Sequence, residues 1–418
     1  MTARKSWWAL LGPGLIWAGT AVGVSHLVQS TRAGAGFGLA LVWVVVVANV
    51  VKYPAFEAGP RYATATGSSL LMGYRRRGLW MVAIFLAVTL STMFTVVAAV
   101  TIVAAGMTAA LAPVTLPVSV WAAGLLALSI AMLAIGRFRL LEAFMKIMMV
   151  ILAVATVLAV AVSLPSVDWS AVGATPWVPT ADTATLAFVV ALVGWMPSAI
   201  DISVWQSLWC LERARGAGEA LDVQEVRFDF NVGYIGTALL ALCFVFLGAA
   251  MLFGSSEELP KSAGAFAVTL IDVFTASLGN WARPILLIAA FATMLSTTVA
   301  VVDGFPRAIE GAVQSVRHDG QPTERTWVYW TALGGITLGA LLIIVQFTGH
   351  LLALVDLATT LTGLTAPVLA AMNLAALRGA EVPEAFRPRG AYLMAHVAAI
   401  VVLASLAALY VWVRFFAG

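Results

Sequence analysis

Charged residues are scarce in this sequence of 418 residues. Asp, Glu, Lys and Arg make up only 10% of the chain, whereas a soluble globular domain carries about 25%. Apolar residues account for 62%, and runs such as Leu39–Val51, Met149–Leu164 and Ala399–Val411 show no polar face at helical spacing. A helix needs about 20 apolar residues to cross a bilayer. These features exclude a large soluble α-helical protein and predict an all-α polytopic membrane protein surrounded by lipid.

Cysteine is almost absent, and so are the usual motifs of enzymes. Cys210 and Cys243 lie in or beside apolar segments without metal-ligand spacing, which predicts small core residues and no disulfide. The sequence has no phosphate-cradling loop, no nucleophile with a positioned base and no H-E-x-x-H pattern. These absences argue against an enzyme and give no sign of a resident cofactor. The net charge of +3 gives no sign of a nucleic-acid partner.

Windowed hydropathy predicts eleven membrane spans, with boundaries good to about four residues. The spans cover residues 8–29, 37–60, 79–111, 115–136, 142–165, 186–210, 230–254, 281–302, 327–348, 351–376 and 391–414. The basic N-terminus precedes an apolar segment without a cleavage site, so we expect the first span to be retained rather than removed as a signal. A shorter apolar segment, Gly264–Leu278, is predicted to be an interfacial or re-entrant helix.

The basic residues predict the orientation of these spans. If the N-terminus is cytoplasmic, all 23 Lys and Arg residues lie on the cytoplasmic side except Arg32, Lys52, Lys261, Arg283 and Arg414. This bias is the one that the positive-inside rule describes. We therefore expect an integral protein of a prokaryotic inner membrane, with a cytoplasmic N-terminus and an external C-terminus.

Two spans are interrupted at matching places, five spans apart. The first span contains the small-residue segment Ala21–His26, and the sixth contains Gly194–Ser198, where Pro197 removes a backbone donor. Paired interruptions are typical of secondary transporters with inverted repeats, here residues 8–165 and 186–376 of a single domain, with 391–414 appended. Gly and Pro also kink tightly packed membrane helices, so a purely structural role stays open.

At these interruptions the sequence resembles the Nramp family of divalent-metal transporters. The run from Gly12-Pro13-Gly14 to Gly38 matches the first span of the family in register, and Met196-Pro197 matches the start of its sixth-span Met-Pro-His motif. Arg227–Phe230 is similar to the family's entry to span seven. The resemblance implies a LeuT-type 5+5 inverted repeat with helices 1 and 6 broken.

The residues that define the chemistry of the family differ in this chain. Its first-span DPGN motif falls on Gly23, Val24, Ser25 and His26, so Gly23 stands where the family has its metal-binding aspartate. The sixth-span histidines are replaced by Ser198 and Ser203. The third span reads Leu90–Thr95 at the place where the family carries acidic residues for proton transfer. The resemblance therefore implies a divergent branch that lacks the usual proton route.

His26, Met196 and Asp356 are the candidate metal ligands. An imidazole and a thioether bind transition metals, and a carboxylate in span ten would restore the charge lost at Gly23. The resemblance also implies the carbonyl of Val193 as a backbone ligand. Each side chain has a structural alternative, namely a histidine bonded to a carbonyl, a gap-filling methionine and an aspartate in a salt bridge.

Other polar residues within the spans have predicted roles because they are costly in a membrane unless paired or hydrated. Asp201 is expected either to line the cavity or to pair with Lys52. Lys52 and Glu57 are predicted to form internal pairs. Asp303 and Arg307, at i and i+4, are predicted to pair with each other.

Thr293, Ser296, Thr297 and Thr298 form a second polar cluster, on span eight. In sodium-coupled members of the broader LeuT-type fold, hydroxyls of span eight and carbonyls of the broken first span hold a sodium ion. The cluster therefore predicts a sodium site at Thr293, Ser296 and Thr297. Hydroxyls also bond across helices in membranes, and this structural alternative stays open.

Two functions are compatible with these features. The first is transport of a divalent metal, as substrate rather than cofactor, by alternating access and without the usual proton coupling. The second is sodium-coupled symport of a small organic solute or anion, with Trp195 and Trp205 stacking on the cargo. In either case we expect a monomer.

Overall fold

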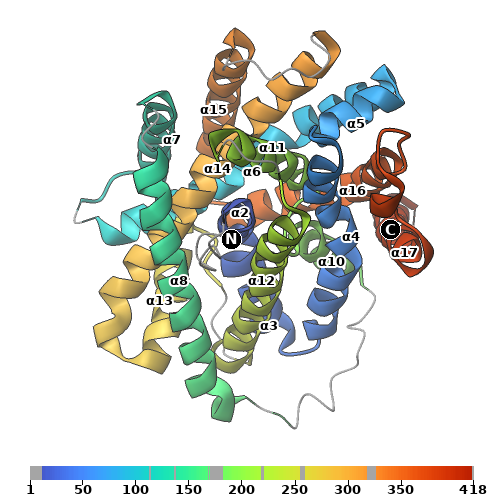
Figure 1. Cartoon of the computed structure of the whole chain (residues 1–418). Coiled ribbons are helices and arrows are strands. Elements are labelled where there is room, and N and C mark those ends of the chain that lie inside the picture. The colour runs from blue at the N-terminus through green and yellow to red at the C-terminus, as the bar shows by residue number, and fades with distance from the viewer. Residues whose placement is uncertain are drawn as a thin grey trace, which may run out of the picture.

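The computed structural model describes residues 12–112, 114–135, 138–167, 169, 182–217, 221–254, 259–317 and 326–416. Within these ranges the regular structure is helical and no strand occurs, as Figure 1 shows. The predicted start of the first span at residue 8 and the basic residues Arg4 and Lys5 lie outside the described residues.

The helices follow the predicted order of spans. The first half of the chain contains α2 (Pro13–Ala21), the π-helix η1 (Ser25–Ser30), α3 (Thr31–Phe37), α4 (Val42–Thr66), α5 (Leu70–Arg77), α6 (Leu79–Leu111), α7 (Val118–Ile135), α8 (Phe138–Ser163) and the short η2 (Leu164–Ser166). The second half contains α10 (Thr183–Trp195), α11 (Ile202–Ala217), α12 (Val223–Met251), α13 (Ala263–Leu278), η3 (Asn280–Ala282), α14 (Arg283–Arg317), α15 (Trp327–Phe347), α16 (Leu351–Leu377), η4 (Glu384–Phe386) and α17 (Gly390–Phe416).

Eight stretches of the described chain are long and apolar enough to cross a membrane, and they correspond to α4, α6, α7, α12, η3 with α14, α15, α16 and α17. Three shorter apolar helices cover Ile147–Ser163, Thr183–Trp195 and Ala263–Leu278. The first predicted span is divided among α2, η1 and α3, and the sixth between α10 and α11. The total of eleven spans stays a prediction.

Helix ends differ from the predicted span ends where polar residues continue a helix. Span eight was expected to end at residue 302, but α14 continues to Arg317. Asp303 and Arg307 lie just beyond the apolar window and form an i,i+4 ion pair of 2.8 Å, which supports the helix there. A hydropathy window detects apolar composition, so it stops before the helix does.

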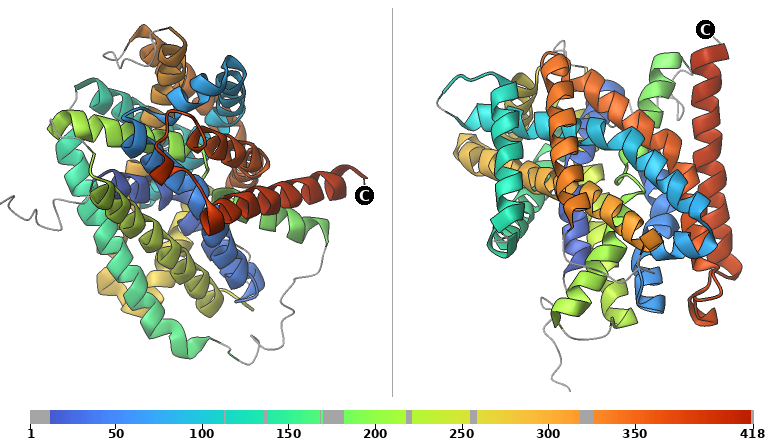
Figure 2. Two further views of the ribbon diagram at one scale, coloured as in Figure 1. Left: turned by 45° about the vertical axis from the view of Figure 1, so that its right-hand side comes forward. Right: turned by 90° about the horizontal axis from the view of Figure 1, so that it is seen from above.

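The first span lies in the interior of the helix bundle. Figure 1 shows α2 near the middle and α17 at the right-hand edge, and α17 also runs along the edge in the right-hand view of Figure 2. α12 packs against α2 and α3. Gly34 on α3 and Gly248 on α12 permit this close approach, because a Cβ on either glycine would collide with the backbone of the other helix. Small residues at membrane helix interfaces commonly have this role.

Asp229 of α12 fixes the start of the first span. Its carboxylate accepts hydrogen bonds from the backbone N–H groups of Gly12 at 2.8 Å and Gly14 at 2.7 Å. These N–H groups have no partner within the helix, and a negative charge at a helix N-terminus is favourable. The sequence element that resembles the family's entry to span seven therefore holds the beginning of span one.

Candidate functional site

Two interrupted helices meet at the centre of the molecule. α2 ends at Ala21 and helix resumes at Val24, which leads into η1, so Val22 and Gly23 stand outside the regular helix. α10 ends at Trp195 and α11 begins at Ile202, which leaves residues 196–201 between them. Pro197 has no N–H with which to continue α10. Both interruptions thus leave backbone groups outside helical hydrogen bonding.

A cavity lies between these interruptions and the helices α6 and α14. Its lining consists of Thr20, Ala21, Val24 and Ser25 from the first span, Trp195, Ser198, Ala199, Asp201, Ile202 and Trp205 from the sixth, Val96 and Val100 from α6, and Thr297, Val301 and Phe305 from α14. It leaves about 30 Å³ for the centres of water-sized molecules. One water needs about 10–15 Å³ on this measure, so the cavity has room for about two waters or a small ion.

Asp201 is the charged side chain of this lining. It is 4% exposed, and its Oδ1 atom is buried without a hydrogen-bond partner. Burial of a carboxylate oxygen without a partner costs considerable free energy. Asp201 lies in the segment between α10 and α11 and takes the first of its two expected roles, to line the cavity, where it supplies an acceptor suited to a cation.

His26 is bonded on both ring nitrogens and lies outside the cavity lining. Its Nε2–H donates to the carbonyl oxygen of Thr237 on α12 at 2.9 Å, and Nδ1 lies 2.7 Å from Ser25 Oγ. The side chain is fully buried. In this conformation it joins the first span to α12, which is the structural alternative expected for a histidine at this position.

Asp356 forms an ion pair with Arg32, the other alternative expected from the sequence. Arg32 Nη1 donates to Oδ1 at 2.5 Å and Nη2 donates to Oδ2 at 3.0 Å. Gln29 Nε2 also donates to Oδ1 at 3.1 Å. The carboxylate thus ties η1 and α3 to α16.

None of the three predicted ligands belongs to the cavity lining. Met196 is fully buried but, like His26 and Asp356, does not line the cavity. The described residues contain no group of three or more His, Cys, Asp and Glu side chains that could hold a metal. The relocated ligand set stays a prediction, and Asp201 is the candidate that faces the cavity.

Lys52 binds backbone carbonyls rather than the predicted carboxylates. Its Nζ atom donates to the carbonyl oxygens of Val193 at 2.5 Å, Gly194 at 2.8 Å and Ser198 at 3.2 Å. The predicted pairing with Glu57 is wrong, because Glu57 pairs with Arg61 at 2.9 Å. Residues five apart on a helix point to different faces, whereas residues four apart are neighbours.

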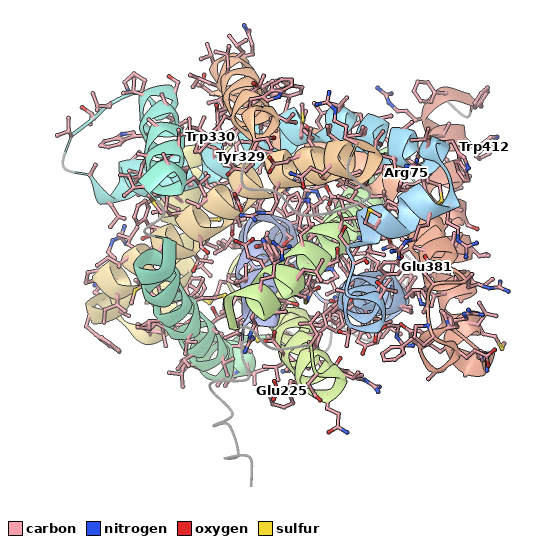
Figure 3. The ribbon with its side chains drawn as sticks, turned by 45° about the horizontal axis from the view of Figure 1, so that its top comes forward. Arg75, Glu225, Tyr329, Trp330, Glu381 and Trp412 are labelled. Carbon is pink, nitrogen blue, oxygen red and sulfur yellow. The ribbon has the colours of Figure 1, made fainter. Side chains whose placement is uncertain are left out.

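The predicted pair of Asp303 and Arg307 is confirmed and belongs to a larger cluster. Arg307 also forms an ion pair with Glu212 of α11. Tyr329, which Figure 3 labels on α15, donates from Oη to Asp303 Oδ1 at 2.5 Å. The cluster links α11, α14 and α15 at the end of span eight, and its side chains do not belong to the cavity lining.

Thr297 occupies the space beside Gly23. A Cβ on Gly23 would lie 2.9 Å from Thr297 Cγ2 and 3.0 Å from its Oγ1. Thr297 Oγ1 donates to the carbonyl oxygen of Gly19 at 3.0 Å, and Thr293 Oγ1 donates to that of Ala289 at 2.8 Å. A Cβ on Gly19 would lie 3.6 Å from Ser296 Oγ. Span eight thus contacts the interrupted first span, and the sodium site stays a prediction.

The role of Lys52 was missed at the level of the sequence. Two sequence features together point to such a contact. One is a lysine in an apolar span, and the other is a proline in another span, which lacks the N–H that would donate to the carbonyl four residues earlier. The distance of 141 residues between Lys52 and Val193 is the reason that the signal is hard to use without a fold.

Comparison with known families gives one match over most of the chain. The model of the family described as natural resistance-associated macrophage protein-like, Nramp, matches residues 14–413. An uncharacterized protein of Pasteurella multocida (strain Pm70) is 34% identical over 383 residues, which cover 89% of this chain and 86% of that protein.

Solved structures with the same fold include two structures of a manganese transporter from Eremococcus coleocola, one with a bound compound and one of a mutant. The complex with an aromatic bis-isothiourea compound has a TM-score of 0.73 at 15% identity and covers 100% of this chain and 90% of that chain. A single-residue mutant has a TM-score of 0.74 at 14% identity with the same coverage. A nucleobase-cation-symport-1 family transporter, closed around bromovinylhydantoin, has a TM-score of 0.56 at 15% identity, covering 96% and 92%. At these identities the likeness shows the fold, which is LeuT-like.

Proposed function

The chain belongs to the Nramp family, and from this premise we propose that it carries a divalent metal cation across the membrane by alternating access, without obligatory coupling to protons. The observation that supports this proposal most directly is the buried, unpartnered oxygen of Asp201 in the cavity between the two interrupted spans. A cation is the ligand that would satisfy this oxygen. Cargo of this kind is a substrate, so no resident cofactor is required.

Oxygen atoms dominate the polar lining of the cavity. Besides Asp201, the hydroxyl-bearing side chains of Thr20, Ser25, Ser198 and Thr297 face it. Carboxylate and hydroxyl oxygens suit hard cations such as Mg²⁺ or Mn²⁺. The small volume also favours an ion over an organic solute in this conformation. We therefore propose that Asp201, rather than the softer donors His26 and Met196, is the central ligand.

The absence of proton coupling rests on the third span. α6 runs from Leu79 to Leu111 and carries no acidic residue along its length. Without a carboxylate, this helix has no group that could exchange a proton with the cavity at neutral pH. We expect cargo movement to leave the proton gradient unchanged.

The proposed architecture is the 5+5 inverted repeat with an appended helix. Eight long apolar helices, the first span made of α2, η1 and α3, the apolar part of α8, and α10 with α11 give eleven spans. In this arrangement α13 is the interfacial or re-entrant helix, the N-terminus is cytoplasmic and the C-terminus is external.

Metal uptake into proteoliposomes tests the proposal. Mn²⁺ and Mg²⁺ uptake would be measured for the parent protein and for Asp201→Asn. We expect uptake to fall by about tenfold or more, because a contact to a charged group worth about 1.5–3 kcal/mol corresponds to a factor of about 10–100. Asp272→Asn is the matched control, because Asp272 on α13 forms an exposed ion pair with Arg283 at the start of α14. A pH-sensitive dye inside the vesicles should report no acidification linked to uptake.

Saturable uptake that is unchanged by Asp201→Asn would remove Asp201 from the site, and tightly linked proton influx would contradict the uncoupled mechanism.

A second function is favoured by a separate observation. The indole N–H groups of Trp195 and Trp205 are buried without partners and belong to the cavity lining. They would suit a polar organic solute or an anion carried with sodium. Sodium-dependent transport with no metal uptake would establish that alternative.

A further inference from the structure

Three backbone carbonyls at and just beyond the end of α10, those of Val193, Gly194 and Ser198, lack the donor that a continuous α-helix would give them, although the Met196 N–H donates to Val193 at 3.3 Å. Val193 would bond to the N–H four residues later, but that residue is Pro197, which has none. The carbonyl of Gly194 lies in the last turn of α10. Beyond Ser198 the chain re-enters helix with Ile202 donating to Ala199 rather than to Ser198. The interruption of the sixth span thus brings three carbonyl oxygens together around one point.

The ammonium of Lys52 fills this group. It reaches the three oxygens at 2.5, 2.8 and 3.2 Å, and an ammonium has three protons to donate. The side chain comes from α4, is completely buried, and forms no ion pair with a carboxylate among the described residues. The carbonyl end of a helix also favours a positive charge. Carbonyl dipoles therefore hold the ammonium directly, and the negative charge of Asp201 attracts it over a longer distance.

We propose that these three carbonyls form a cation-binding site, and that Lys52 is a tethered cation which permanently occupies it. The chemical class of ligand for the site is a small monovalent cation, either an alkali ion or a primary ammonium. Because the cation belongs to the chain, the parent protein needs no such ion from solution at this position. The proposal does not depend on the cargo, since Lys52 does not line the cavity.

Removal of the tethered cation should make the protein dependent on a cation from solution. The melting temperature, Tm, of the purified full-length protein in detergent would be measured for the parent chain and for Lys52→Ala. The salts would be choline, sodium, potassium and ethylammonium chloride at equal ionic strength. We expect the parent Tm to be the same in all four salts. The variant should melt roughly 5–10 °C lower in choline, because three buried carbonyls lose the hydrogen bonds of the ammonium, and ethylammonium or sodium should restore Tm with a saturable dependence.

Lys261→Ala is the matched control, since Lys261 is exposed, and its Tm should not depend on the cation. An Lys52→Ala variant that melts equally in all four salts overturns the proposal. If this variant cannot be purified in choline, the same purification in sodium or ethylammonium distinguishes a cation site from a structural role. Folded protein in the small cations supports a cation site, whereas failure in every salt shows a structural role for Lys52 and overturns it. Metal uptake by the parent chain is a separate readout, so failure of the proposed function would be distinguishable.

Discussion

At the scale of single residues, Gly23 and Thr297 show how this chain departs from its family. The resemblance places Gly23 where the family has its metal-binding aspartate, and in the structure Thr297 from α14 lies against Gly23. On that correspondence, Thr297 fills the space that a carboxylate at position 23 would need. Restoring the aspartate alone should not restore the site.

We expect Gly23→Asp to destabilise the protein by about 1–3 kcal/mol, because the new Cβ would lie 2.9 Å from Thr297 Cγ2 and overpacking has a cost of this size. Gly23→Asp combined with Thr297→Ala should fold better and bind Mn²⁺ more tightly than the parent. Thermal unfolding and calorimetric titration measure the two effects. Gly36→Asp is the control, since a Cβ on Gly36 meets nothing within 4 Å. A single Gly23→Asp variant with undiminished stability would contradict this account.

The sequence predicts which polar residues are candidates for the site, but it does not predict which partners they bind. Asp201 had two expected roles, to line the cavity or to pair with Lys52, and it belongs to the cavity lining. His26 had two expected roles, as a metal ligand or as a packing residue bonded to a carbonyl. Its partner Thr237 is 211 residues away in the sequence. Local patterns do not encode which of several carbonyls a buried side chain reaches, so the choice between ligand and packing residue required the fold.

At the scale of helices, the ion pair of Arg32 and Asp356 joins α3 to α16. The two side chains are 15% and 38% exposed, so the pair is partly accessible to solvent. Arg32 lies just beyond the predicted external end of span one, and Asp356 lies in the predicted external half of span ten. Movement of the first span away from the tenth would require this pair to separate, and the pair therefore stabilises the arrangement of these two spans in this structure.

Asp356→Asn should make the cavity more accessible from outside. A partly exposed pair contributes up to about 1 kcal/mol, which corresponds to an increase of up to about fivefold in the open population. The measurement is the rate at which an impermeant thiol reagent labels Val301→Cys, a cavity-lining position, in a background with Cys210→Ala and Cys243→Ala. Glu384→Gln, which breaks the exposed pair with Arg389, should leave the rate unchanged. A labelling rate insensitive to Asp356→Asn would show that other contacts close this side.

The helices themselves follow from local sequence to a large extent. The third span was predicted over 79–111 and α6 covers Leu79–Leu111, because an uninterrupted apolar run defines both. The first span was predicted to end at residue 29, but helix continues through α3 to Phe37. The glycine-rich segment Thr31–Phe37 reads as a loop by propensity. Its packing against α12 stabilises the helix instead, which is information that a local window does not contain.

At the scale of the whole molecule, the distribution of basic residues predicts one orientation in the membrane. An alkaline phosphatase fused after residue 418 should be active, since the C-terminus is expected outside. The same enzyme fused after Leu377, between spans ten and eleven, should be inactive because that loop is expected in the cytoplasm. Enzyme activity of intact cells is the measurement. Activity of the Leu377 fusion together with inactivity of the C-terminal one would reverse the orientation, and equal activities would contradict the count of spans.

The ammonium held at the end of α10 has an electrical consequence. A cation that is covalently part of the chain returns with the chain, so it carries no net current through a complete cycle and no sodium gradient can do work through it. For a divalent cargo, each turnover would then transfer two charges. A potential of 100 mV supplies roughly 5 kcal/mol for two charges, enough for about a thousandfold accumulation of the ion. The membrane voltage alone would therefore be a sufficient energy source, and the current should reverse when the voltage does.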